Sequence, residues 1–300
     1  MTRRTHTAVL VLLALLLARC GSSSATPRSA PGLPDTVRVG IIPNIAPDTQ
    51  RALYTPLGDY LARTLHRKVE LFVATNYAGV VTALAAGKID VAYLGGLTYV
   101  QADKQVPVTP VVTEVDRETG TAKYLSAVVV RAGSRYRTVD DLLAGHASFA
   151  FGDPSSTSGS LYPRLMLDAA GARCTTDRLD SCPPLSSVRF TGGHDATALA
   201  VAAGRVDAGG LELRILHKLE KKGTVGPGAL RVLDSRQVEG YPWVVRTALG
   251  APASDAVREA FLSIRDPALL SLLRAKSYVA VQPADYAEVR TEALRLGLLR

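Results

Sequence analysis

The sequence contains few of the residues on which several classes of protein depend. It has three cysteines, two methionines and one tryptophan in 300 residues, and aromatic residues make up only 6%. Three cysteines are too few for a disulfide-dense scaffold. Their spacing, with no histidine cluster nearby, does not match a zinc site either. We therefore predict a chain that uses no metal ion and no cofactor.

Neither sign of charge is strongly depleted or concentrated. The chain has 35 Lys and Arg residues against 27 Asp and Glu, a net charge of +8. The basic residues are scattered and form no stripe with interleaved aromatic residues, so the composition argues against nucleic-acid binding. A mild excess of positive charge still attracts anions in general.

Only one long apolar run is present, at the N-terminus. Residues 8–18 form an apolar stretch of about eleven residues after Arg3 and Arg4, which is too short to span a membrane and typical of a signal peptide. The run ends in Leu-Ala-Arg-Cys-Gly, which resembles a lipobox with Cys20 as the lipidated residue. Because Arg19 is larger than the residue usual there, a plain cleaved signal is the alternative. The paired arginines leave the twin-arginine export route open beside the general one.

The next segment, 21–36, is rich in Ser, Pro, Ala and Gly and has no periodicity, so it predicts a flexible tether. Removal of residues 1–20 would take away three arginines and no acid, which lowers the net charge from +8 to +5. The sequence thus predicts an exported domain held at the outer side of the cell membrane by a lipid, facing the periplasm or the cell surface.

From position 37 onward, short β-branched runs alternate with amphipathic stretches, the pattern of an α/β protein with mostly parallel sheets. The predicted strands are 37–42, 69–75, 89–94, 108–112, 125–131, 147–151, 188–191, 206–211, 230–233 and 243–246. Helices are expected between them and, near the C-terminus, over 254–264, 268–276 and 283–298. We predict two lobes joined by two crossover strands. The first lobe comprises 37–125 plus 242–300, and the second comprises 126–241.

Two stretches of the chain repeat one pattern. Residues 83–92 and 200–209 each read as a helix end, a glycine, a basic residue and a strand with an early aspartate. The glycine suits the left-handed turn that ends a helix. Tyr77 and His194 each lie ten residues before that glycine, just ahead of a helix, so both are candidates to face a shared cleft. The alternative is that the pattern is a common helix-to-strand connection.

The strongest local signal is a strand at 147–151 followed by a row of hydroxyl residues, Ser155 to Ser158, which we call the hydroxyl turn. Pro163 lacks an N–H and is accommodated only near a first helical turn, so a helix should begin at about 158–160. Backbone N–H groups and the dipole at a helix N-terminus attract anions, and the hydroxyls add donors. Simple N-capping is the alternative, although four hydroxyls exceed that need.

These stretches resemble those of the phosphonate-binding family of periplasmic proteins. The family carries Asp-Pro-x-Ser-Thr-Ser-Gly and a later Gly-His-x-x-x-Ala-Leu-Ala-Val, which match 153–159 and 193–201, and 76–80 is similar to a third stretch. The resemblance covers about 37–249. It implies a two-lobed type II periplasmic-binding-protein fold that captures a phosphonate, phosphite or phosphate for an ABC permease. It also implies ligand contacts from the following residues: Tyr77, Ser156, Thr157, Ser158 and His194.

Three positions near the expected ligand bear on which ligand binds. Glu212 matches an acidic residue that amine-bearing phosphonate binders use, whereas Tyr241 stands where those proteins have an aspartate. Tyr93 is expected to line the same wall, with core packing as the alternative. Because one carboxylate is missing, we predict a small ligand without an amine.

Three further expectations complete the sequence analysis. Cys174 and Cys182 lie in a polar stretch and predict a disulfide in an exported protein. An enzyme that uses a serine of the hydroxyl turn with His194 as base is disfavoured, because nothing identifies an orienting third residue. We predict a monomeric binding protein, and a ligand-sensing lipoprotein that acts on a receptor is the remaining alternative.

Overall fold

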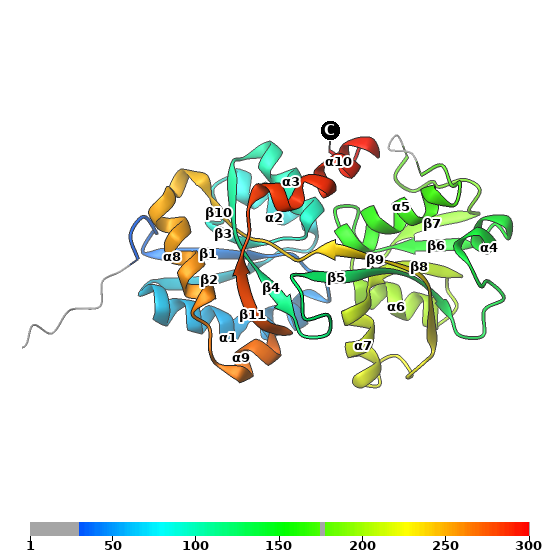
Figure 1. Ribbon diagram of the computed structural model, residues 1–300, viewed down its shortest axis with the longest axis horizontal. Coiled ribbons are helices and arrows are strands. Elements are labelled where there is room, and N and C mark those ends of the chain that lie inside the picture. The colour runs from blue at the N-terminus through cyan, green and yellow to red at the C-terminus, as the bar shows by residue number, and fades with distance from the viewer. Residues whose placement is uncertain (1–29, 175–177, 300) are drawn as a thin grey trace, which may run out of the picture.

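The computed structural model describes residues 30–174 and 178–299. Two α/β lobes lie side by side along its long axis, each with one sheet flanked by helices (Figure 1). The predicted two-lobed fold is confirmed. The predicted signal peptide, Cys20 and most of the tether lie outside the described residues.

The first lobe contains a six-stranded sheet in the order β11-β4-β10-β3-β1-β2. Strands β1, β2 and β3 are parallel, whereas β10 runs antiparallel to β3 and β4, and β11 antiparallel to β4. Its strands are β1 (Thr36–Ile41), β2 (Lys68–Val73), β3 (Val91–Tyr93), β4 (Val108–Asp116), β10 (Trp243–Arg246) and β11 (Ala275–Ala280).

The second lobe contains a five-stranded sheet in the order β7-β6-β8-β5-β9. Strand β6 is parallel to β7 and β8, and β5 is antiparallel to β8 and β9. Its strands are β5 (Lys123–Arg131), β6 (Ser148–Phe151), β7 (Ser187–Phe190), β8 (Ala208–Glu212) and β9 (Leu230–Glu239).

Both sheets are mixed, so the prediction of mostly parallel sheets is wrong in this respect. The βαβ units give the parallel pairs that the alternating pattern predicts. The chain passes from β4 to β5 and from β9 back to β10, and each of these four strands makes only antiparallel pairs. The strands that connect the lobes therefore account for the difference.

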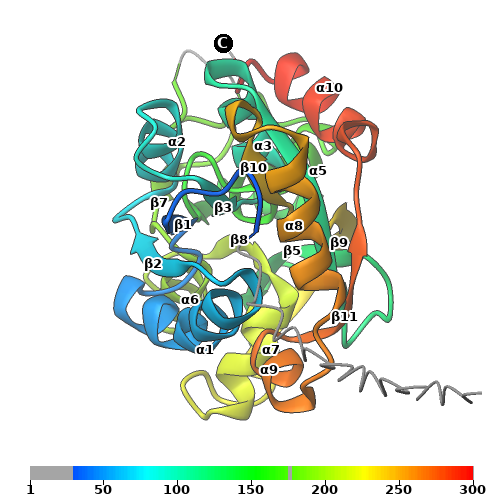
Figure 2. The same ribbon diagram turned by 90° about the vertical axis from the view of Figure 1, so that its left-hand side faces the viewer.

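Helices cover the sheets of both lobes, as the two perpendicular views show (Figure 2). The helices of the first lobe are α1 (Pro47–Leu65), α2 (Tyr77–Ala85), α3 (Gly96–Gln105), α8 (Ala251–Leu262), α9 (Pro267–Leu272) and α10 (Ala287–Arg295), with short 3₁₀ turns η2 (Thr247–Leu249) and η3 (Pro283–Tyr286). Those of the second lobe are α4 (Val139–Ala144), α5 (Tyr162–Ala169), α6 (His194–Ala202) and α7 (Leu213–Lys221), with the π-helical turn η1 (Thr157–Leu161). None of the helices within 30–174 and 178–299 is both long enough and apolar enough to cross a bilayer.

Two segments differ from their predicted structure. The chain is packed from Ala30 rather than from position 37, because Ala30 and Leu33 are buried in the first lobe and the Ala30 N–H donates to the Leu65 carbonyl (3.1 Å). The expected helix over 268–276 ends at Leu272, and β11 follows it. Strand pairing of β11 with β4 overrides the helical preference of this segment.

The repeated pattern is a structural repeat. Gly87 and Gly204 both have φ of +67°, the left-handed conformation expected after α2 and α6. Three residues later, Asp90 and Asp207 accept hydrogen bonds from the backbone N–H groups of Arg38 (2.9 Å) and Ser148 (2.8 Å). Each aspartate thus ties the start of its strand to the neighbouring parallel strand of the same lobe, β3 to β1 and β8 to β6. The two lobes share this supporting framework.

Candidate functional site

The hydroxyl turn leads into a continuous helix that starts with η1 and continues as α5. The helix begins at Thr157, one residue before the predicted 158–160, because Ser156 caps it: its Oγ accepts from the Gly159 N–H (3.0 Å). The Ser156 carbonyl also accepts from the Leu161 N–H (3.0 Å). π-Turns often mark functional sites.

Pro163 explains how this helix is attached to the sheet. Because Pro163 has no N–H, it cannot donate a helical hydrogen bond back to Ser158 or Gly159, the residues five and four positions before it. The Ser158 carbonyl accepts from the Ser126 hydroxyl on β5 (2.9 Å), and the Gly159 carbonyl accepts from the Gly152 N–H (2.8 Å). The first turn of the helix is therefore fixed to the strands beneath it.

The first three hydroxyls of the helix start have different partners. Ser156 is the N-cap, as the conservative interpretation of the sequence allowed. The Thr157 Oγ1 accepts from the Leu97 N–H of the first lobe (2.9 Å), so this residue joins the lobes. Ser158 is fully buried, and its Oγ has no hydrogen-bond partner among the described residues.

His194 is the first residue of α6, and its ring lies against the hydroxyl turn. A Cβ built on Gly159 would be 3.1 Å from His194 Cε1, so only glycine fits there. Burial lowers the pKa of His194 to about 4, and the imidazole is neutral at pH 7. Its Nδ1 accepts from the Glu212 N–H (3.2 Å), which places the proton on Nε2. This Nε2–H is buried and has no partner within the described chain.

Tyr77 and Tyr124 bring phenol groups to the same cluster. Tyr77 begins α2, is buried, and donates its N–H to Asp153 of the second lobe (3.2 Å). Burial and then Asp153 raise the pKa of Tyr77, which Ser156 partly offsets. Burial raises the pKa of Tyr124 on β5, and Ser158 lies close enough to lower it in part. The Tyr124 hydroxyl makes no hydrogen bond with the described residues.

The other three predicted site residues form a wall beside this cluster. The Tyr241 ring stacks between those of Tyr93 (5.1 Å) and Tyr124 (4.9 Å). The Tyr241 hydroxyl donates to Glu212 Oε2 (2.6 Å), and the Tyr93 hydroxyl donates to Glu114 (3.3 Å). The structure thus brings Tyr77, Ser158 and His194 together. The side-chain oxygens of the wall residues, in contrast, already have hydrogen-bond partners within the protein.

Arg214 is a buried residue that the sequence did not single out. Its Nε donates to Glu212 Oε1 (2.6 Å), and its Nη1 donates to Glu114 (3.3 Å) and Asp116 (3.0 Å) of the first lobe. Arg274, from the first lobe, lies 3.8 Å from Glu212 Oε1. Burial raises the pKa of Glu212, but Arg214 and Arg274 outweigh it and lower the value to about 2.

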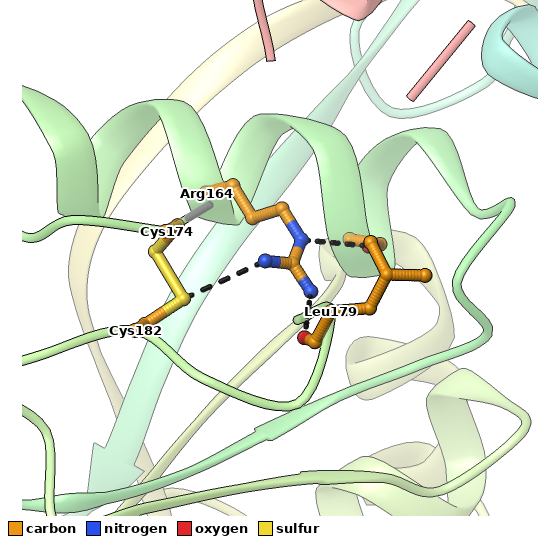
Figure 3. The surroundings of a disulfide bond; sticks show 5 residues. Arg164, Cys174, Leu179 and Cys182 are labelled. Atoms are coloured by element: carbon orange, nitrogen blue, oxygen red, sulfur yellow. Dashed lines mark hydrogen bonds between the residues drawn. A yellow bond between two sulfur atoms is a disulfide. The ribbon is translucent and has the colours of Figure 1, made fainter. Parts of the chain in front are cut away.

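The predicted disulfide between Cys174 and Cys182 is present and is connected to the helical turn η1 through Arg164 (Figure 3). The buried guanidinium of Arg164 donates to the Leu179 carbonyl (2.6 Å) within the disulfide loop and to the Ser160 hydroxyl (3.3 Å). It also lies over the Phe151 ring at 4.2 Å. Burial lowers the pKa of Arg164 to about 10.

A cavity of about 220 Å³ opens between the lobes beside the start of α6. Its polar lining includes Asn44, Asp195, Lys218, Lys222 and Arg274. Burial and then Arg274 lower the pKa of Lys218 to about 8. The approach to the cleft on this side is therefore predominantly basic.

Comparison with known proteins gives the family. The sequence profile described as "ABC transporter, phosphonate, periplasmic substrate-binding protein" matches residues 39–286. The chain belongs to this phosphonate-binding family. Family members are substrate-binding transport proteins, so this chain is a binding protein and not an enzyme.

Individual family members are similar over most of the chain. The phosphate-import protein PhnD of Mycolicibacterium smegmatis is 32% identical, over 93% of this chain and 91% of that protein. The phosphonates-binding periplasmic protein of Escherichia coli is 27% identical over 81% of this chain and 70% of its own length. The structure of PhnD1 from Prochlorococcus marinus with methylphosphonate has a TM-score of 0.77 at 23% identity, and covers 88% of this chain and 99% of that one. At that identity, the structural likeness shows the fold.

Several residues of the cluster were missed at the sequence level. Asp153 was visible within the Asp-Pro motif but was not assigned a role, and it accepts hydrogen bonds from Tyr77 and Ser155. Arg214 follows Glu212 by two positions, a spacing that alone predicts nothing. Tyr124 lies on a strand that connects the lobes, where the sequence signals only a β-strand.

Proposed function

We propose that the protein captures a small phosphorus oxyanion without an amino group, namely a phosphonate, phosphite or phosphate, for an ABC importer. The observation that carries this is the set of three buried groups, Ser158 Oγ, His194 Nε2 and the Tyr124 hydroxyl, that have no partner among the described residues. They lie next to the start of a helix, and each is able to donate a hydrogen bond.

Neutral donors suit a ligand that brings its own negative charge. Buried donors left unpaired cost roughly 1–3 kcal/mol each, and an acceptor-rich anion satisfies all three together. The helix N-terminus adds favourable electrostatics, and the low dielectric between closed lobes strengthens each contact. Tyr77, Ser156 and Thr157 complete the proposed ligand set from the two lobes.

The relatives' names agree with a small ligand of this class. They describe phosphate import and phosphonate binding. The wall formed by Tyr93, Glu212 and Tyr241 closes the site on one side. In this proposal the first lobe comprises 37–125 plus 242–300, onto which residues 30–36 pack, and the second comprises 126–241. The ligand lies between the lobes.

Attachment to the membrane completes the proposal. We expect Cys20 to carry a lipid after signal cleavage, and residues after it to tether a monomer at the extracytoplasmic face, where it delivers the ligand to a permease. The cationic lining of the interlobe cavity, with Lys218, Lys222 and Arg274, favours the approach of anions.

Isothermal calorimetry with phosphate, phosphite, methylphosphonate and sulfate tests this function. We expect at least one phosphorus oxyanion to bind and sulfate to bind much more weakly. Ser158→Ala should weaken binding by about 1.5–3 kcal/mol, since it removes a hydrogen bond to a charged group. The control Ser186→Ala alters an exposed hydroxyl in the same lobe and should bind as the wild type does. Failure of every phosphorus oxyanion to bind would refute the proposal.

A further inference from the structure

The site has a charged side as well as a neutral one. Five charged residues, which we call the charged cluster, meet beside the wall: Glu114, Asp116, Glu212, Arg214 and Arg274. All three carboxylates contact the guanidinium of Arg214, which is buried at 3% exposure. Arg214 is therefore the centre of the cluster.

The charged cluster adjoins the neutral donors directly. Glu212 donates its N–H to the His194 ring, and it accepts from the Tyr241 hydroxyl. The guanidinium carbon of Arg214 lies 4.6 Å from the centre of the Tyr124 ring, whose hydroxyl belongs to the neutral group. A substituent on a bound phosphonate that extends toward Glu212 would thus meet Arg214.

We propose that the guanidinium of Arg214 occupies the position beside Glu212 that the ammonium group of a ligand would need. The site is thereby restricted to phosphorus oxyanions without an amino group. This inference rests on the proposed function. It assigns to Arg214 the selection between ligands, a role that is additional to the loss of an aspartate at Tyr241.

The hydrogen bonds of Glu212 support this assignment. One carboxylate oxygen accepts from Arg214 and the other accepts from Tyr241. An ammonium would have to displace one of these donors, and it would lie within a few ångströms of a guanidinium of the same charge. Buried like charges repel strongly because little solvent screens them.

The remaining nitrogen of Arg214 supports the same preference. Its Nη2 is buried and has no partner among the residues described. A guanidinium offers only donors. A ligand substituent near it is therefore favoured when it is an oxygen acceptor or a small apolar group, and disfavoured when it is a cation.

The test compares two ligands of nearly equal shape, n-propylphosphonate and 2-aminoethylphosphonate. The first has a methyl group where the second has an ammonium group. We expect the wild type to bind propylphosphonate more tightly. Arg214→Met keeps much of the side-chain volume and removes the charge. It should shift the affinity ratio toward 2-aminoethylphosphonate by about 10- to 100-fold, because carboxylates of the cluster become available to the ammonium.

Arg214 also joins the lobes, and its loss could weaken lobe closure. Weaker closure lowers the affinity for both ligands alike, so it cancels in the ratio. Arg214→Lys keeps the positive charge and should keep the wild-type ratio. Glu114→Gln removes an interlobe carboxylate but leaves the cation, and it should also leave the preference against the amine in place.

The outcomes separate this inference from the proposed function. An unchanged ratio in Arg214→Met, with methylphosphonate still bound, overturns the role of Arg214 and leaves the function intact. A wild type that prefers 2-aminoethylphosphonate overturns the inference and the proposed absence of an amine, and leaves the capture of a phosphorus oxyanion intact. If Arg214→Met does not fold, Arg214→Gln, which keeps hydrogen bonds to the carboxylates, must show the same shift. If the wild type binds no phosphorus oxyanion, it is the function that fails.

Discussion

The two lobes share one framework but differ where they meet. Tyr77 and His194 each begin a helix, and each donates its N–H across the cleft, to Asp153 and to the Asn44 carbonyl respectively. The loop after β1, residues 43–46, has no hydroxyl side chain, whereas the loop after β6 leads into the hydroxyl turn. The same backbone arrangement is therefore followed by a row of hydroxyl side chains in only one lobe.

A second pair of equivalent positions shows the same divergence. Gly95 and Glu212 both precede a helix that follows a short strand, and they lie eight residues after Gly87 and Gly204. One lobe has no side chain at this position, and the other has the carboxylate that organises the charged cluster. In the proposed site, the second lobe therefore supplies most of the hydrogen-bond donors and the first lobe covers them.

The largest expected effect comes from Glu212. Glu212→Ala removes a carboxylate partner of the buried Arg214 guanidinium and of the partly buried Arg274 guanidinium. Breaking a buried ion pair from one side costs about 3–5 kcal/mol of unfolding free energy. Urea unfolding measures it. In the first lobe, the exposed pair of Lys68 and Glu70 offers a control, since Glu70→Gln should have no measurable effect. Equal stability of the two variants would contradict the contrast between the lobes.

The next effect is a pH dependence of the free energy of unfolding that His194 causes. Its counterpart in the first lobe, Tyr77, does not titrate between pH 5 and pH 7 and so causes none. The pKa of His194 is about 4 in the folded protein and 6.5 as its ordinary value. Below pH 6.5, the unfolded chain binds a proton that the folded chain does not bind until about pH 4, so stability falls as pH falls through this interval. Between pH 6.5 and pH 5 the loss is roughly 1.5 kcal/mol.

Urea unfolding of the ligand-free protein at several pH values measures this loss. His194→Gln removes the titrating group and should show a shallower decrease over the same interval. A decrease of the same size in both proteins would mean that other groups cause it.

The smallest effect concerns the covering role of the first lobe. A Cβ at Gly95 would lie 2.8 Å from Thr157 Oγ1 across the cleft, so Gly95→Ala forces one lobe to shift. Overpacking of this kind costs about 1 kcal/mol or somewhat more, and we expect it in ligand affinity and not in unfolding of the separate lobes. Gly133→Ala, with open space around the new methyl group, is the control. Unchanged affinity in Gly95→Ala would show that the lobes need not meet here.

Local patterns predicted the framework well. The β-branched runs predicted most of the strands. The Gly-basic-apolar-Asp pattern predicted the structural repeat that contains Gly87 and Gly204. The hydroxyl turn was placed at a helix start because Pro163 limits where that helix begins. Each of these features depends on residues that are near one another in the sequence.

The charged cluster could not be predicted in the same way. Arg214 meets Glu114 and Asp116 about 100 residues away along the chain, through contacts that exist only when the lobes meet. Strand β11 was missed for a similar reason, since its partner β4 is distant in sequence and its own residues favour a helix. Pairing over long separations decides both cases.

The disulfide loop has a consequence for where the protein matures. The bond between Cys174 and Cys182 forms only where thiols are oxidised, and the loop it closes holds Arg164 against the first turn of the helix that we propose binds the anion. A chain retained in a reducing compartment would lack this brace. The proposed binding site is therefore fully braced only after export. We expect precursor molecules inside the cell, which lack the disulfide, to bind phosphate or phosphonate more weakly.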